Sequence, residues 1–127
     1  MNEYALDASA VLALLNQEPG HEEVSALISR SILGSVNLCE VLGKLIDAGI
    51  VEADAREAVE LLGVPIIPFD AEMALAAAAL RPHTRTLGLS LGDRSCLALA
   101  LARGATVVTT ERAWAKLKFG LTIHLVR

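Results

Sequence analysis

Short strand-like segments alternate along this chain with longer segments of helical periodicity, and this alternation constrains the fold most. The strand-like segments cover residues 4–6, 34–36, 65–69, 105–108 and 121–126. The connections between them are too long for hairpins, so we expect the strands to run parallel. A parallel sheet is covered by helices on both faces. The sequence therefore predicts a three-layer α/β/α sandwich around a short parallel sheet.

The helical segments carry recognisable start and stop signals. Asp54 followed by Glu57 is a capping-box pattern, and Asp70 is placed to cap an Ala-rich helix. Pro82 must end that helix, so residues 83–89 are expected to form a loop. We expect helices over residues 9–16, 21–30, 37–49, 54–63, 70–81, 93–103 and 111–118.

Length and composition fit one domain spanning residues 1–127, with 54% hydrophobic and only 3% aromatic residues. The core must therefore consist of Ala, Leu, Val and Ile. No apolar run approaches the ~18 residues of a membrane span. Glu3 and Asp7 stand where a signal peptide carries basic residues, so a cytoplasmic location is expected and no membrane partner. Cys39 and Cys96 lack zinc-ligand spacing and are expected to be buried, reduced thiols.

The charges are distributed unevenly. The formal net charge is −4, but residues 1–80 hold three bases and thirteen acids, whereas residues 81–127 hold eight bases and two acids. A basic half in an acidic protein indicates a polyanionic partner, unless folding interleaves the two halves.

Four acids follow the predicted strands, where an open parallel sheet binds its ligands: Asp7, Glu40, Asp93 and Glu111. Each could instead cap or flank a helix N-terminus, as in Asn37…Glu40 and Ser90…Asp93. Four carboxylates that converge repel one another and need a cation, and oxygen ligands suit Mg²⁺ or Mn²⁺.

Four segments place these acids in a recognisable order: Leu6-Asp7-Ala8-Ser9, Asn37-Leu38-Cys39-Glu40-Val41, Leu91-Gly92-Asp93-Arg94 and Val107-Val108-Thr109-Thr110-Glu111-Arg112-Ala113-Trp114. With these motifs the sequence resembles the PIN domain family, and most closely its VapC-type toxins. This resemblance implies a PIN-like fold in which Asp7, Glu40 and Asp93 bind metal. Glu111 stands where the family commonly has Asp, and Thr109 is an accessory hydrogen-bonding candidate.

The resemblance implies a metal-dependent endoribonuclease, the toxin of a type II toxin–antitoxin pair. In this hypothesis Asp7 and Asp93 hold the principal Mg²⁺ or Mn²⁺, Glu40 completes the shell, and Glu111 positions a second ion or the attacking water. Arg94 and Arg112 would contact RNA phosphates. The implied partners are the RNA substrate, a cognate antitoxin on the helices between residues 21 and 62, and a second copy in a homodimer.

Three other functions compete. A PIN-like domain that binds RNA or a partner without cleaving it is the main alternative, suggested by the substituted Glu111. A receiver-type phosphoacceptor would need paired acids after the first strand, where Asp7 stands alone. Gly88-Leu89-Ser90-Leu91-Gly92 matches a serine-hydrolase motif with His124 downstream, but no strong strand precedes it.

Overall fold

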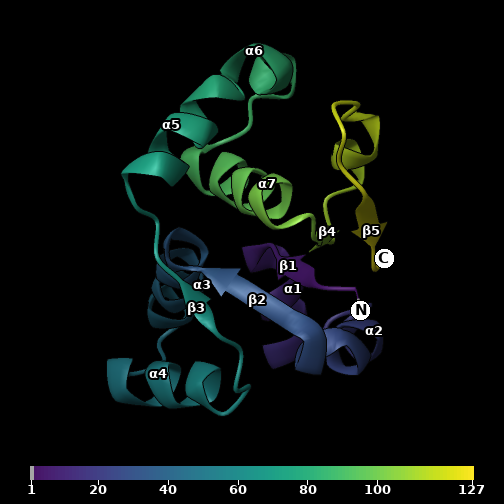
Figure 1. The fold of residues 1–127 in the computed structure, drawn as a ribbon. Helices are drawn as coiled ribbons and strands as arrows, with labels where there is room; N and C mark the ends of the chain where they lie inside the picture. Colours follow the sequence, from purple (N-terminus) through teal and green to yellow (C-terminus); the bar gives the residue numbers. More distant parts are fainter. Residues whose placement is uncertain (1) are drawn as a thin grey trace.

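The computed structural model describes residues 2–127, and its sheet has five strands in the order β3-β2-β1-β4-β5 (Figure 1). All neighbouring strands pair in parallel. The strands are β1 (Tyr4–Leu6), β2 (Ser31–Gly34), β3 (Ile66–Ile67), β4 (Thr106–Thr109) and β5 (Ile123–Leu125). The predicted parallel sheet is confirmed, and β1 lies at its centre.

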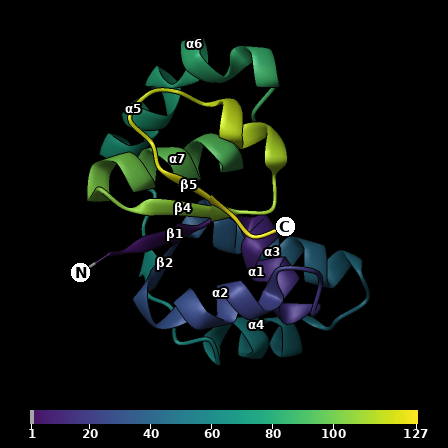
Figure 2. The same ribbon diagram turned by 90° about the vertical axis from the view of Figure 1, so that its right-hand side faces the viewer.

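Helices cover both faces of this sheet, so the predicted three-layer sandwich is confirmed. In Figures 1 and 2 one face carries α1 (Ala8–Leu15), α2 (His21–Leu27), α3 (Ser35–Asp47) and α4 (Glu52–Glu60). The opposite face carries α5 (Ala71–Ala79), α6 (Arg81–Thr84) and α7 (Leu91–Arg103). Three short 3₁₀ turns complete the described chain: η1 (Ile28–Arg30), η2 (Arg85–Leu87) and η3 (Arg112–Lys116).

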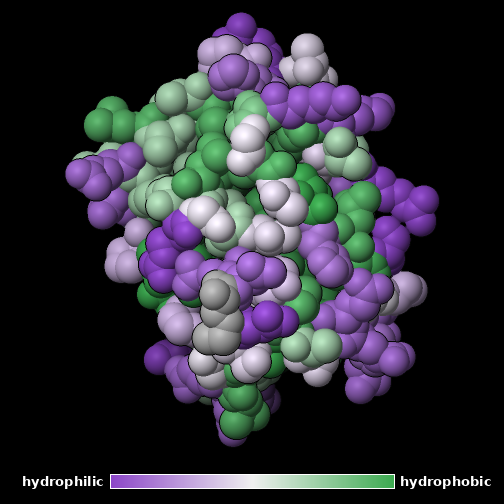
Figure 3. All heavy atoms as spheres, turned by 45° about the vertical axis from the view of Figure 1, so that its right-hand side comes forward, coloured by the Kyte–Doolittle hydropathy of each residue, from purple (hydrophilic) through white to green (hydrophobic). Residues whose placement is uncertain are grey.

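Alternating side chains of the central strands build two cores. Ala5, Ile32 and Val107 face α5 and α7, while their neighbours Leu6, Leu33 and Val108 face α1, α2, α3 and α4. Figure 3 shows apolar side chains gathered over the upper part of the molecule, on the side of the sheet that carries α5, α6 and α7 in Figure 1. In residues 2–127 there is no helix with both the length and the apolarity needed to cross a membrane.

Several element boundaries differ from the sequence prediction. The second strand is Ser31–Gly34 rather than 34–36, because Ile32 and Leu33 fill the two cores and Ser35 already begins α3. Residues 83–89 are not simply a loop, since Pro82 lies in the first turn of the short helix α6, where its missing N–H costs nothing. Cys96 is buried as predicted, but Cys39 is exposed.

The capping predictions had different outcomes. Asp70 caps α5, with its Oδ1 accepting from the Met73 N–H at 2.9 Å. The capping box at Asp54 is wrong, because α4 begins at Glu52 and Asp54 lies inside its first turn.

The strand order creates a switch point beside β1. From β1 the chain moves to β2 and β3 on one side, then returns to the other side as β4 and β5. Open parallel sheets bind ligands at the carboxyl ends of the strands on either side of such a point. Here those ends are Leu6 of β1 and Thr109 of β4.

Gly20, the residue before α2, lies very close to the backbone of the chain after β5. Its φ is +97°, and a Cβ at this position would overlap the Val126 carbonyl group. Gly49 has the same φ of +97°, but a Cβ there would meet no heavy atom within 4 Å in the described chain.

We expect Gly49→Ala to lower the free energy of unfolding by about 1 kcal/mol, the cost of a left-handed alanine. Gly20→Ala should cost roughly 1–3 kcal/mol more, because the Val126 backbone must move. Urea unfolding of both variants measures the difference. Equal losses would show that the Gly20–Val126 approach does not constrain the fold.

Candidate functional site

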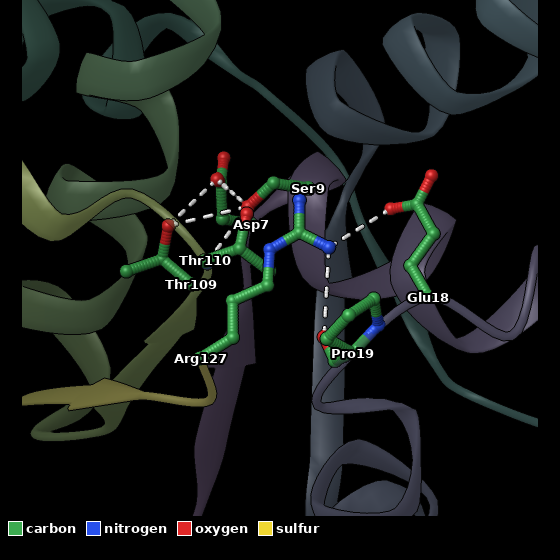
Figure 4. Close-up of polar contacts among 7 residues, drawn as sticks. All are labelled: Asp7, Ser9, Glu18, Pro19, Thr109, Thr110 and Arg127. Atoms are coloured by element: carbon green, nitrogen blue, oxygen red, sulfur yellow. Dashed lines mark hydrogen bonds and ion pairs between the residues drawn. The ribbon is translucent and has the colours of Figure 1, made fainter.

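Asp7 lies at the end of the central strand, and its carboxylate is held by two hydroxyl groups. It is only 3% exposed. Ser9 Oγ donates to Asp7 Oδ2 at 2.6 Å, and Thr109 Oγ1 donates to the same oxygen at 3.0 Å (Figure 4). Asp7 is the residue before α1, but its side chain makes no capping hydrogen bond within the described chain. The Asp7 carboxylate therefore does not act as a helix cap in the described chain.

The same hydroxyl groups tie the end of β4 to α1. Ser9 Oγ lies 3.2 Å from Thr109 Oγ1 and accepts from the Thr110 N–H at 3.1 Å. Thr109 Oγ1 also accepts from the Glu111 N–H at 3.0 Å. The Thr109 hydroxyl group therefore bonds both the Asp7 carboxylate and the backbone of Glu111.

Glu40 is held by an asparagine one turn earlier in α3. Asn37 Nδ2 donates to Glu40 Oε1 at 2.8 Å and to the Gly92 carbonyl at 3.0 Å, so one amide links α3 to α7. Asn37 is not the N-cap that the sequence suggested, because α3 begins at Ser35. A Cβ at Gly92 would overlap the Glu40 carboxylate, so any larger residue here would force that side chain to move.

Asp93 takes part in a capping box at the start of α7. Its Oδ2 accepts from the Ser90 N–H at 2.9 Å, and its own N–H donates to Ser90 Oγ at 3.1 Å. The capping alternative is therefore correct for Asp93, which also lies near the other acids. Because Ser90 Oγ is a cap and His124 pairs with Glu23, the serine-hydrolase alternative has no structural support.

The charges of Asp7, Glu40 and Asp93 act on one another. The pKa of Asp7 is raised from 3.8 to about 6: burial is the main cause, the hydrogen bonds from Ser9 and Thr109 oppose the rise, and the charges of Asp93 and Glu40 add to it. Burial also raises the pKa of Glu40, opposed by the Asn37 hydrogen bond; the charge of Asp93 adds to the rise and that of Lys44 opposes it. Repulsion among these carboxylates favours a bound cation.

The donor chemistry fits a hard divalent cation. The donors are carboxylate oxygens, and none of them forms an ion pair with a basic side chain in residues 2–127. Asn37 Oδ1 is also buried without a hydrogen-bond partner in the described chain. Among the described residues, no three or more His, Cys, Asp or Glu side chains are arranged so that they could hold a metal ion. The three acids thus offer oxygen donors of the right chemistry, but they do not form a coordination shell.

The remaining predicted site residues lie further out. Glu111 is exposed and lines a cavity beside Ser9. It is not among the charges that raise the pKa of Asp7, which are those of Asp93 and Glu40. Arg94 is half-buried, and its Nη1 donates to the Ala77 carbonyl of α5 at 3.1 Å. Arg112 is exposed at the start of η3. Metal binding by Glu111 and phosphate binding by these arginines stay predictions.

Three contributors were missed by sequence reasoning: Ser9, Asn37 and Gly92. Ser9 lies two residues after Asp7 in the segment Leu6-Asp7-Ala8-Ser9, and this spacing is the available sequence signal. Asn37 precedes Glu40 by three residues, a spacing that also brings side chains together inside a helix. No local sequence signal marks Gly92. A Cβ at this position would overlap Glu40, which lies on another helix, so the constraint comes from a contact between distant elements.

The raised pKa of Asp7 makes stability depend on pH when metal is chelated. The folded state binds this proton more tightly than the unfolded state, so the free energy of unfolding should fall as the pH rises from about 4 to above 6. The shift corresponds to roughly 3 kcal/mol. We expect Asp7→Asn to remove most of this fall and to be more stable than the wild type at pH 8 in EDTA. Urea unfolding across pH, with exposed Asp47→Asn as control, tests this, and parallel Asp7→Asn and wild-type profiles would contradict it.

Comparison with known proteins places this arrangement in a family. The family profile described as PIN domain matches residues 4–120. A comparison with curated protein sequences gave no match.

Solved structures of VapBC toxin–antitoxin complexes share the fold. A chain of VapBC2 from Rickettsia felis, bound to a promoter DNA fragment, has a TM-score of 0.75 at 18% identity, over 98% of each chain. DNA-bound VapBC from Salmonella typhimurium gives 0.76 at 20% identity over 100% of each chain. VapBC-5 from Mycobacterium tuberculosis gives 0.67 at 22% identity, covering 100% of this chain and 99% of that one. Because the family profile covers residues 4–120, which include four of the five strands and Asp7, Glu40 and Asp93, this chain belongs to the PIN domain family.

Proposed function

We propose that this protein is a divalent-metal-dependent endoribonuclease, the toxin of a type II toxin–antitoxin pair. The observation that carries the proposal is that Asp7, buried at the end of β1 beside the switch point of the sheet, lies close enough to Glu40 and Asp93 for their charges to raise its pKa. Membership in the PIN family and the shared fold with VapBC complexes support the same function.

Each protein group has a defined task in this proposal. When bound, Mg²⁺ or Mn²⁺ supplies Lewis acidity and lowers the pKa of water. Asp7, Asp93 and Glu40 are the residues that would hold it. Ser9 and Thr109 fix the rotamer of Asp7, and Asn37 fixes that of Glu40. Water attacks the phosphodiester without the 2′-hydroxyl, so the products carry 5′-phosphate and 3′-hydroxyl ends.

An antitoxin partner is part of the proposal, because the structures that share this fold are VapBC complexes. An apolar cavity of about 560 Å³ lies between α3 and α4, with Leu38, Leu42 and Val59 in its lining. Leu61 nearby is 79% exposed. This surface overlaps the helices between residues 21 and 62, where we place the antitoxin. A homodimer and a cytoplasmic location also belong to the proposal.

Cleavage of a mixed cellular RNA pool by partner-free protein tests the function. We expect discrete cuts with 5′-phosphate ends in Mg²⁺ or Mn²⁺ and none in EDTA. Asp7→Asn and Asp93→Asn should each lower cleavage at least about 100-fold, because a metal-binding carboxylate is lost. Calorimetric Mn²⁺ binding without any cutting would favour the non-cleaving PIN-like domain instead.

Gly92→Ala tests the position of Glu40 without touching an acid. The new methyl group must displace the Glu40 carboxylate, so cleavage should fall about 10–100-fold. Helical stability should not fall, because alanine favours helix over glycine. Gly43→Ala in α3 is the matched control, since its Cβ would meet nothing within 4 Å in the described chain. Wild-type cleavage by Gly92→Ala would refute the role given to Glu40.

A further inference from the structure

A second cavity opens directly beside the hydroxyl groups that hold Asp7. Its volume is about 350 Å³. Ser9 and Thr110 belong both to its lining and to the hydrogen-bond network around the Asp7 carboxylate. Leu12 and Leu45 give it an apolar part, so the cavity has both a polar and an apolar wall. Its volume lies at the lower end of the roughly 300–1,000 Å³ of small-molecule sites.

Lys44 supplies one cation to this cavity. It lies four residues after Glu40 in α3, on the same side of the helix, and its charge lowers the pKa of Glu40. The Lys44 side chain is exposed and has no ion pair or hydrogen bond in the described part of the chain. Its charge therefore acts on Glu40 and also faces the cavity.

Arg127 supplies a second cation from the other wall. Its Nη1 lies 3.3 Å from Glu18 Oε1 and 3.5 Å from the Pro19 carbonyl (Figure 4). The side chain is 37% exposed, so water screens the pair with Glu18. This ion pair is weak enough to be exchanged for a more highly charged ligand.

Lys44 and Arg127 line this cavity together with the carboxylates of Glu18 and Glu111, beside the proposed cleavage centre. The two cations are the groups of the lining that can pair with a phosphate. We propose that this cavity binds a nucleotide unit of RNA adjoining the scissile phosphodiester, with Lys44 and Arg127 contacting its phosphate. The apolar wall around Leu12 and Leu45 then receives the sugar or base. This assignment rests on the proposed nuclease function and makes Lys44 and Arg127 positioning residues.

RNA binding in EDTA tests the cavity separately from cleavage. The probe is a fluorescently labelled single-stranded RNA oligonucleotide, followed by anisotropy at several salt concentrations. Lys44→Gln and Arg127→Gln should each weaken binding about 3–10-fold and reduce the slope of log K against log salt by about 0.7, the effect of one lost phosphate contact. Arg56→Gln, in the α3–α4 cavity, is the control and should bind as the wild type.

Glu18→Gln distinguishes ligand binding from a structural role of Arg127. If the arginine binds phosphate, removing Glu18 releases it and should tighten RNA binding about 2–3-fold. If Arg127 only stabilises the fold, Glu18→Gln and Arg127→Gln should change RNA binding in the same direction. In metal, cavity variants should raise KM with kcat nearly unchanged.

The possible results separate this inference from the proposed function. If the wild type cleaves RNA, and Lys44→Gln and Arg127→Gln bind RNA as tightly as the wild type, only the cavity assignment is overturned. Absence of cleavage together with weakened binding by both variants would keep the cavity as an RNA site in a non-cleaving domain. Absence of RNA binding by the wild type, or an effect of the variants on an acidic peptide but not on RNA, would overturn the assignment.

Discussion

The structure depends on placing a buried carboxylate, Asp7, beside two others without a basic partner in residues 2–127. Burying an ionised group away from water destabilises a fold unless hydrogen bonds or a counter-ion compensate it. Two hydroxyl groups compensate Asp7 in part, and its pKa still rises to about 6. The apolar cores on both faces of the sheet must therefore offset a charge arrangement that protonation or a bound cation would relieve.

Short parallel strands make this placement possible. Leu6 pairs with Val108 in adjacent strands, so the next residues, Asp7 and Thr109, stand side by side where both chains leave the sheet. Because α1 begins at Ala8, Ser9 turns back toward Asp7 within the first turn. A shift of register by one residue would send these side chains to the opposite face. The apolar residues that pack the sheet thus also set the position of the site.

The sequence predicts what depends on local pattern. The alternation of strand segments with helical segments predicts the parallel sheet, and the acids directly after strands predict the edge of the sheet at which Asp7 lies. What depends on contacts between distant elements is hidden: Asn37 was interpreted as a cap, but its amide joins Glu40 to Gly92. The same limit applies to the second strand, because only packing of Ile32 and Leu33 against both cores places it three residues earlier. Asp93 shows that a carboxylate in a capping box can also lie close enough to Asp7 to raise its pKa.

An acidic site that handles a polyanion needs nearby cations, and helical geometry decides which ones are available. Successive helix residues point about 100° apart, so Arg94, next to Asp93, points away from it and bonds the Ala77 carbonyl. Residues four apart share a face, which brings Lys44 to the side of Glu40. Lys44 belongs to the acidic half of the chain, so the charge asymmetry between halves did not mark it. In the proposed RNA site, the candidate phosphate-binding base Lys44 is therefore found by its i, i+4 spacing from Glu40, and not by adjacency to an acid or by regional charge.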